Sequence, residues 1–123
     1  MNQFEDQRRF MKACDQTVDH YNMDQYNMYL KLIREETGEL HSALMDADPV
    51  EQLDALIDIL VVTIGAIHSA GFDAEGAWKE VMRSNFDKIS SDGKVRRRED
   101  GKILKPSDWT PPELQQFTRT KND

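Results

Sequence analysis

The chain has 123 residues, of which 38% are hydrophobic and 32% are charged, and this is typical of one globular domain. Its net charge of −7 argues against nonspecific binding to nucleic acid or to an anionic membrane surface. The longest apolar run, residues 59–67, is too short to span a bilayer, and the N-terminus carries no apolar signal segment. The chain contains one cysteine, which cannot form an internal disulfide. These features predict a single cytoplasmic domain over residues 1–123, with no nucleic-acid or membrane partner.

The first ninety residues carry helical patterns. Apolar residues recur at helical spacing over residues 4–18 and again, most regularly, over residues 26–44. Asp48 followed by Pro49 is typical of the N-terminus of a third helix, and Asp73 of the N-terminus of a fourth. The sequence therefore predicts an all-α fold, a small antiparallel helical bundle of about four helices with a core over about residues 1–90.

The third helical pattern is the most hydrophobic. Its stripe is wide, so we expect this helix to be the most buried; the stripe consists of Leu53, Leu56, Ile57, Leu60, Val61, Ile64 and Ile67. Four helices of this length make a thin core. The wide apolar face therefore favours a homo-oligomer, either a dimer or a tetramer.

The pattern changes after Ser90. Three prolines exclude a long final helix, and Asp100 followed by Gly101 is a tight-turn signal between two short flanking segments. Residues 88–105 hold seven lysines and arginines against three acids. We expect a basic, irregular or hairpin-like C-terminal arm over about residues 91–123.

Acidic residues gather on two of the predicted helices. Residues 35–58 contain eight acids and no lysine or arginine. Glu36 and Glu39 flank the apolar stripe of the second helix, and Asp54 and Asp58 fall on one strip of the third, together with Glu51. If the two helices are antiparallel neighbours, the acidic strips converge, and a divalent cation would relieve their repulsion. The alternative is a solvated helical face.

The residue types narrow the choice of metal. No Glu-x-x-His pair occurs, and His20, His41 and His68 are scattered, so a di-iron or zinc site is not expected. Oxygen-only ligation favours Mg²⁺, with Mn²⁺ as the alternative. We interpret His68, which lies near the stripe of the third helix, as a core histidine.

Candidate phosphate-binding residues follow the acidic region. Asn85 continues the apolar face of the fourth helix, where a polar side chain requires either a buried backbone partner or a ligand. Lys88 lies one turn later, and residues 96–98 are three arginines that are able to close over the same phosphates. The alternative for the arginines is a solvated strand face.

Several motifs occur in a fixed order along the chain. They are EETGEL at residues 35–40, DALID at 54–58, EVMRSNFDK at 80–88, DGK at 92–94 and EDGK at 99–102. Together they resemble the all-α nucleoside triphosphate pyrophosphohydrolases, a superfamily of MazG-type enzymes, phosphoribosyl-ATP pyrophosphohydrolases and dimeric dUTPases. The likeness covers roughly residues 23–114 and is closest to the small, single-domain branch that is similar to phosphoribosyl-ATP pyrophosphohydrolases.

The resemblance implies hydrolysis between the α and β phosphates of a nucleotide, which yields a monophosphate and pyrophosphate. It implies Mg²⁺ held by Glu36, Glu39 and Asp58, with Glu36 or Glu39 also able to act as the catalytic base. The family's Glu-x-x-Asp pattern fails at Ala55, so the fourth metal ligand is either Asp54 or Glu51.

On the substrate side, the resemblance matches Asn85 and Lys88, and Lys94, Arg96 and Arg98 of the arm complete the candidate set. We favour a nucleoside triphosphate over phosphoribosyl-ATP, in nucleotide-pool housecleaning, and the base is left open. Two alternatives remain: a catalytically silent relative that binds nucleotides or a partner, and a helical interaction module whose acidic and basic zones pair with each other.

Overall fold

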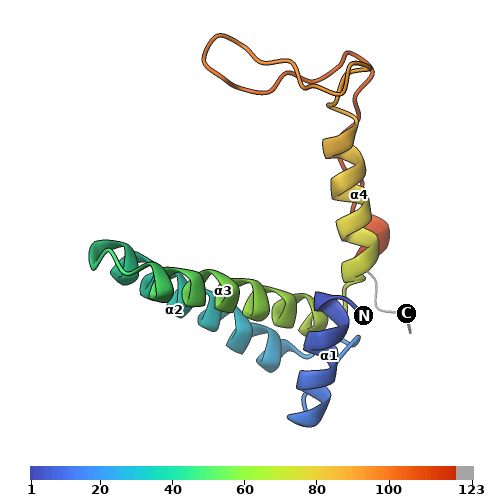
Figure 1. The fold of residues 1–123 in the computed structure, drawn as a ribbon. Helices are drawn as coiled ribbons and strands as arrows, with labels where there is room; N and C mark the ends of the chain where they lie inside the picture. Colours follow the sequence, from blue (N-terminus) through green and yellow to red (C-terminus); the bar gives the residue numbers. More distant parts are fainter. Residues whose placement is uncertain (119–123) are drawn as a thin grey trace.

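The computed structural model describes residues 1–118 and is built from helices (Figure 1). In these residues it contains α1 (Gln3–Ala13), α2 (Met23–Met45), α3 (Pro49–Ser69), α4 (Ala74–Phe86) and a short 3₁₀ helix η1 (Gln115–Phe117). Only isolated β-bridges accompany these helices in the described part. The predicted all-α fold is confirmed, and the last residues of the predicted arm, 119–123, lie outside the described residues.

Helices α2 and α3 form a long antiparallel hairpin (Figure 1). The carboxylate of Asp48 accepts hydrogen bonds from the backbone N–H groups of Val50 and Glu51, at 3.1 and 3.2 Å, and Pro49 occupies the first turn of α3. A capping carboxylate satisfies N–H groups that the helix leaves unpaired, and proline lacks one of them. The predicted start of this helix is therefore confirmed.

A close contact between Tyr29 and Gly65 sets the spacing of the hairpin. The ring of Tyr29 is buried and lies so near Gly65 that a Cβ atom on this glycine would overlap it. Met11 of α1 and Ala66 of α3 belong to the same buried cluster, and the Tyr29 hydroxyl donates a hydrogen bond to Gln16. The first three helices therefore meet around one aromatic ring.

Arg8 joins α1 to the beginning of α4. Its buried guanidinium donates to both carboxylate oxygens of Glu75, at 2.7 and 2.8 Å, and to Asp19 at 3.2 Å. The hydrogen bonds from Arg8 lower the pKa of Glu75 to about 2. Bidentate arginine–carboxylate pairs are directional as well as strong, so this contact orients α4 as it leaves the hairpin.

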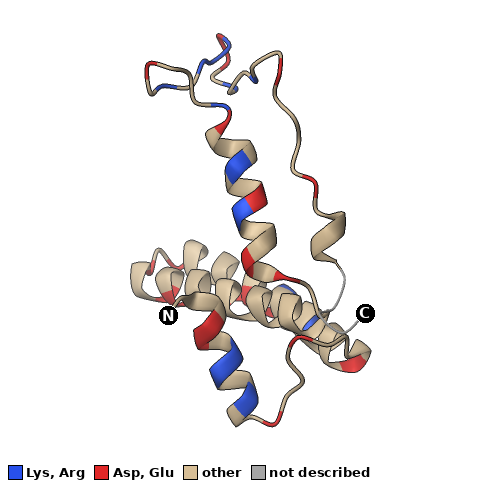
Figure 2. Cartoon of the chain, turned by 90° about the vertical axis from the view of Figure 1, so that its right-hand side faces the viewer, with Lys and Arg blue, Asp and Glu red and all other residues tan. Residues whose placement is uncertain are grey.

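Helix α4 forms a second limb that points away from the α2–α3 hairpin and carries the basic arm at its far end (Figures 1 and 2). The chain after the arm then returns along α4. A hydrogen bond of 2.6 Å from the indole N–H of Trp109 to the carbonyl oxygen of Ser84 attaches this returning segment to the helix. At the base of this limb, the N–H of Asp73 donates to the carbonyl of Phe117 at 2.9 Å.

The arm contains the predicted hairpin-like turn. The N–H of Arg98 donates to the carbonyl of Lys102 at 2.8 Å, and the N–H of Leu104 donates to the carbonyl of Arg96 at 2.7 Å. Gly101 lies between them with a φ of 87°, a left-handed conformation that glycine adopts without strain.

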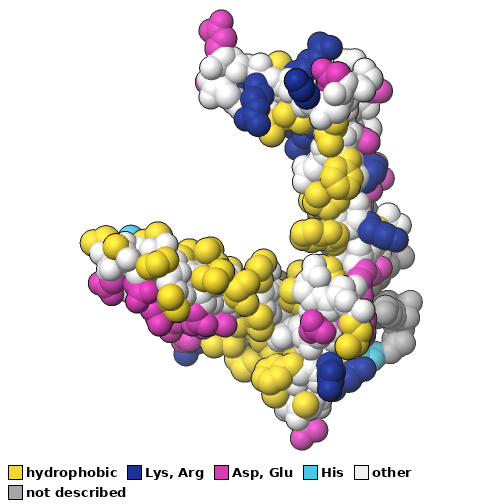
Figure 3. Space-filling model, in the orientation of Figure 1, with side chains coloured by type: hydrophobic (Ala, Val, Ile, Leu, Met, Phe, Trp, Pro, Cys, Tyr) yellow, Lys and Arg dark blue, Asp and Glu magenta, His cyan; other side chains and the backbone are white. Residues whose placement is uncertain are grey.

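Helix α3 holds six buried residues, more than any other described helix, but most of the wide apolar stripe that was expected to be its buried face is exposed in the isolated chain. Leu53, Ile57 and Leu60 are 62%, 50% and 58% exposed. Instead, small residues such as Ala55 and Gly65 are buried on this helix, because they allow the close approach of α2. The large apolar side chains lie on the other side of α3, facing the gap between the two limbs (Figure 3). None of the described helices is long and apolar enough to cross a membrane.

Replacing Gly65 by alanine tests the contact that sets the hairpin spacing. The added methyl group overlaps the Tyr29 ring, so we expect the free energy of unfolding to fall by about 1–3 kcal/mol, the usual cost of overpacking. Urea denaturation measures the change. Gly38→Ala is the matched control: it lies in the same hairpin with nothing within 4 Å of its added Cβ, and should gain up to about 1 kcal/mol. Equal effects at the two sites would contradict this assignment.

Candidate active site

Carboxylates from both helices gather at the seam between α2 and α3. Glu36 lies two helical turns after Tyr29, on the side of α2 that meets α3. One of its carboxylate oxygens is buried and has no hydrogen-bond partner among the described residues. A buried polar atom without a partner is rare in a folded protein and requires an explanation, of which a bound ion is one.

The surroundings of Glu36 oppose its ionisation. Burial is the largest cause that raises the pKa of its carboxyl group, and the negative charges of Glu39, Asp58 and Asp54 raise it further. The carboxylates of Glu39, Asp54 and Asp58 therefore lie near enough to Glu36 to act on it electrostatically, as expected if the acidic strips of the two helices converge. Repulsion of this kind destabilises the chain by itself, and a cation would remove it.

The two candidates for a fourth ligand are associated with different members of the predicted ligand set. Asp54 is among the charges that act on Glu36. Glu51 lines a hollow nearer the end of the hairpin, together with Glu39, Asp46 and Asp48. Ala55, where the family pattern has a carboxylate, is buried. We retain Asp54 in the candidate set because its charge acts on Glu36.

The donor set of the seam fits a hard divalent cation. It offers only carboxylate oxygens, including the buried and unpartnered oxygen of Glu36. As these side chains stand, no group of three or more histidine, cysteine, aspartate or glutamate residues within residues 1–118 is placed to hold a metal ion. His68 is buried away from the seam, with Nε2 at 3.0 Å from the carbonyl oxygen of Phe4. It is thus a core histidine, as interpreted from the sequence.

Asn85 and Lys88 lie at the end of the other limb. Asn85 is exposed, and its side-chain oxygen accepts a hydrogen bond from the Lys88 ammonium at 3.1 Å. The expectation that Asn85 interrupts a core face is wrong, because Trp78 and Phe86 on the same helix are 54% and 59% exposed. This face of α4 is exposed to solvent, like the apolar stripe on α3 (Figure 3).

The arm residues divide into two groups. Lys94 is exposed, and Arg98 pairs with Asp100 at 2.7 Å within the turn. Arg96 instead joins Lys88 and Lys105 around a hollow of about 480 Å³, whose rim also carries three serine residues. Sequence reasoning missed Lys105.

An aromatic ring supports this cationic hollow. The ammonium groups of Lys105 and Lys88 lie 4.4 and 5.4 Å from the ring centre of Trp109, a cation–π arrangement. The position of Lys105 four residues before Trp109 is the only sequence signal for this role, and it is weak by itself.

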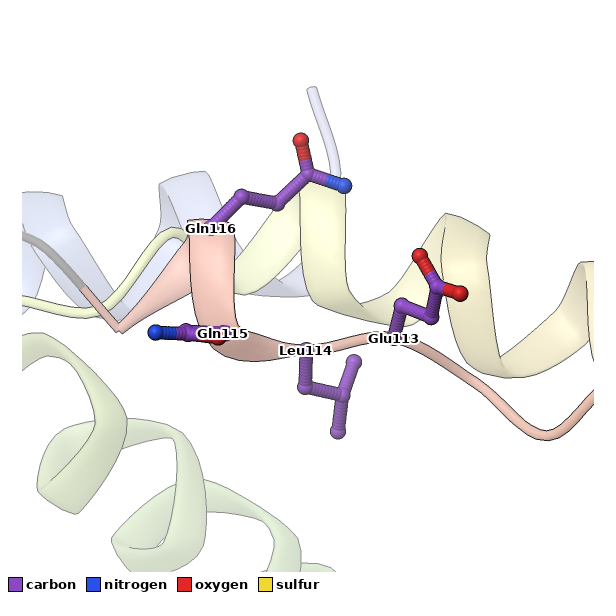
Figure 4. Close-up of a pocket in the computed structure, with 4 residues that line it drawn as sticks. All are labelled: Glu113, Leu114, Gln115 and Gln116. Carbon is purple, nitrogen blue, oxygen red and sulfur yellow. The ribbon is translucent and has the colours of Figure 1, made fainter.

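A larger hollow of about 690 Å³ is lined by residues 113–116 (Figure 4). Its four side chains point in different directions rather than toward one place (Figure 4). The backbone N–H of Glu113 donates to Glu80 at 2.7 Å, which ties this segment to α4. We assign the hollow no chemistry.

Comparison with known proteins adds one result. Residues 5–85 match the family model described as phosphoribosyl-ATP pyrophosphohydrolase, about two thirds of the chain. The match contains the carboxylates of the seam and ends at Asn85, so Lys88, Arg96 and Lys105 lie beyond it. No curated protein matches the chain.

Glu36→Gln tests the electrostatic strain at the seam. A neutral amide is not repelled by the neighbouring carboxylates, so the free energy of unfolding at pH 7, with chelator present, should rise by about 1 kcal/mol. Because the pKa of Glu36 is raised in the folded chain, the gain should shrink as the pH falls below the folded-state pKa and vanish below the ordinary value of 4.5. Urea denaturation at several pH values measures it.

Glu35→Gln provides the control, since Glu35 is exposed on the same helix and should leave stability nearly unchanged. A loss of stability in Glu36→Gln at pH 7 would show that the carboxylate is stabilised rather than strained.

Proposed function

Because the chain belongs to the phosphoribosyl-ATP pyrophosphohydrolase family, a family of nucleotide pyrophosphohydrolases, we propose that it hydrolyses nucleoside triphosphates between the α and β phosphates. The products are a nucleoside monophosphate and pyrophosphate, and the role is housecleaning of the nucleotide pool. The observation that carries this proposal is the buried, unpartnered oxygen of Glu36 among three further carboxylates.

Mg²⁺ is the cofactor that the seam fits best, with Mn²⁺ as the alternative. Glu36, Glu39, Asp54 and Asp58 would hold it. When bound, such an ion neutralises phosphate oxygens and lowers the pKa of a water molecule.

The carboxylates of the seam also have a role in proton transfer. Hydrolysis of a phosphoanhydride needs a positioned water and an acceptor for its proton, but no covalent intermediate. One carboxylate oxygen of Glu36 has no hydrogen-bond partner and is therefore available to accept this proton. We therefore assign the role of base to Glu36, with Glu39 beside it on the same helix.

One observation supports the alternative of a catalytically silent nucleotide-binding relative. The position at which the family pattern has a carboxylate is Ala55, which is buried and offers no oxygen donor. A silent relative binds Mg²⁺ and nucleotide without releasing pyrophosphate, so binding and turnover measured on the same sample separate the two functions.

We propose in addition that the chain works as a homo-oligomer, in the simplest case a dimer. Large apolar side chains face solvent along α3 and α4 in the isolated chain, and Leu60, Trp78 and Phe86 are each more than half exposed. Exposed apolar patches of this extent are typical of protein interfaces. At the base of the gap between the limbs, α1, α3 and α4 also line an apolar hollow of about 530 Å³.

Pyrophosphate release from a panel of nucleoside triphosphates tests the proposed reaction. We expect release that requires Mg²⁺, stops with EDTA and falls by at least about 100-fold in Glu36→Gln, because a ligand and base is lost. Glu35→Gln should retain nearly the full rate. Release of orthophosphate would show that a different bond is cleaved, and Mg²⁺ binding without turnover would favour the silent relative.

Light scattering coupled to size-exclusion chromatography tests the oligomer. The native chain should elute with at least twice the mass of 14.3 kDa, and Leu60→Glu should shift it towards the monomer, because a charge cannot be buried in an apolar interface. Met45→Glu is the control, since Met45 is exposed but lies at the end of the hairpin, away from the stripe. A monomeric native chain would refute the oligomer.

A further inference from the structure

We propose that Arg83 is a positioning residue for phosphate binding. It holds residues 109–117, which we call the strap, along α4, and the strap fixes the shape of the cationic hollow at the end of that helix. The inference rests on the proposed function, with the hollow as the place where phosphates of the nucleotide bind. It adds a role for a residue of the motif at 80–88 to which the candidate site assigns none.

One side of α4 faces the strap along the length of the helix. The residues on this side are spaced by four, three and one positions, so they share a helical face; they are Gly76, Glu80, Arg83 and Ser84. The ring of Phe117 lies so near Gly76 that a Cβ atom on this glycine would overlap it. One turn further along, Glu80 accepts a hydrogen bond from the backbone N–H of Glu113 at 2.7 Å. The strap therefore runs antiparallel to α4 and contacts it from the base upwards (Figure 1).

The guanidinium of Arg83 bridges α4 and the strap. Its Nε and Nη2 atoms donate to the two carboxylate oxygens of Glu80, at 3.1 and 2.9 Å, and Nη1 donates to Asp87 at 2.9 Å. The same guanidinium reaches the strap, where Nη1 donates to the hydroxyl group of Thr110 and Nη2 donates to the carbonyl of Pro111, each at 3.2 Å. The two carboxylates thus orient the guanidinium, and the guanidinium orients the strap.

These contacts distinguish Arg83 from the cations of the hollow. The hydrogen bonds from Arg83 lower the pKa of Glu80 to about 2, so the pair stays charged at neutral pH. Among residues 1–118, in contrast, Lys88, Arg96 and Lys105 form no ion pair. Their charges lie around one hollow beside the hydroxyl groups of three serine residues, which matches the charge and the acceptor oxygens of a phosphate chain. Arg83 therefore acts on phosphate binding through the strap rather than through its own charge.

Trp109, the first residue of the strap, connects it to the hollow. Its indole N–H donates to the carbonyl of Ser84, in the last turn of α4, where a helix leaves carbonyl groups unpaired. The centre of its ring lies 4.4 Å from the ammonium group of Lys105 and 5.4 Å from that of Lys88. Cation–π attraction to one ring therefore holds two like charges at the same place.

The shape of the hollow depends on where the strap lies. Like charges repel, so Lys88, Arg96 and Lys105 stay together only while the surrounding contacts hold them. Lys105 lies four residues before Trp109, and a backbone hydrogen bond of 3.1 Å from Trp109 to Pro106 closes the turn between them. Release of the strap would therefore move the ring and Lys105 together, away from Lys88, and would open the hollow.

Two substitutions of Arg83 test the positioning role. Arg83→Gln removes the charge, and Arg83→Lys keeps the charge but cannot bridge α4 and the strap as a planar guanidinium does. We expect both variants to weaken the binding of inorganic triphosphate with Mg²⁺, measured by calorimetry, by about 10-fold. In pyrophosphate release, KM should rise by a similar factor and kcat should change by less than about threefold, because the carboxylates of the hairpin are untouched.

Lys79→Gln is the matched control. Lys79 lies on the same helix, is exposed and forms no ion pair within residues 1–118, so its loss removes one positive charge without a change at the strap. Its affinity for triphosphate should stay within about twofold of the wild-type value. Amide hydrogen exchange adds a local measurement: residues 109–117 should exchange at least about 10-fold faster in both Arg83 variants but not in Lys79→Gln, and the α2–α3 hairpin should keep its protection in all three.

Three results would overturn the positioning role. Wild-type affinity in Arg83→Lys, with a loss in Arg83→Gln, would show that charge alone is required. Faster exchange of the strap with unchanged triphosphate binding would show that the hollow does not depend on the strap. Loss of protection in the α2–α3 hairpin would show that the substitutions destabilise the whole chain rather than the strap.

Triphosphate binding requires no turnover, so the positioning role and the proposed reaction are tested separately. A wild-type chain whose triphosphate binding depends on Arg83 but which releases no pyrophosphate would refute the reaction and retain the positioning role. A wild-type chain that releases pyrophosphate, with Arg83 variants that bind triphosphate normally, would retain the reaction and overturn the positioning role. A wild-type chain that binds no triphosphate would also overturn it.

Discussion

Gly65 allows the ring of Tyr29 to lie against the backbone of α3, and the distance between the two acidic helices follows from that contact. Two turns further along α2, the same face of the helix brings Glu36 into the seam, where one of its oxygens is buried without a partner. The packing that stabilises the hairpin therefore also produces the electrostatic strain at its acidic end. A seam built only from Leu and Ala would be more stable, but it would have nothing to offer a cation.

Sequence patterns predicted the helices well because each depends on local chemistry. The 3.6-residue period places the acids of α2 and α3 beside the contact between these helices, and Asp48 caps α3 as its position before Pro49 indicates. The side of α3 that meets α2 was not predictable in this way. Periodicity favours the face with the largest apolar residues, whereas close helix packing uses small ones, here Ala55, Gly65 and Ala66.

The candidate site likewise contains one part that sequence spacing predicts and one part that it does not. Spacing on two helices was sufficient to predict that Glu39, Asp54 and Asp58 lie near enough to Glu36 to act on its carboxyl group, since antiparallel neighbours share their contact face. The role of each basic residue in the arm depends on contacts that sequence spacing does not encode. Arg98 is engaged by Asp100 two residues away, whereas Arg96 and Lys105 approach each other only because the turn at Gly101 folds the arm.

The contacts of Arg8 at the base of α4 also determine where the far end of that helix lies. It fixes the base of α4, and the 13 residues of that helix extend about 20 Å from the junction at 1.5 Å per residue. A rotation of about 10° at the junction would displace the far end of α4 by about 3.5 Å, more than the length of a hydrogen bond. A small change in the orientation of α4 at its base is therefore amplified at its far end. The guanidinium of Arg8, near the N-terminus, thus determines where the cations of the arm lie.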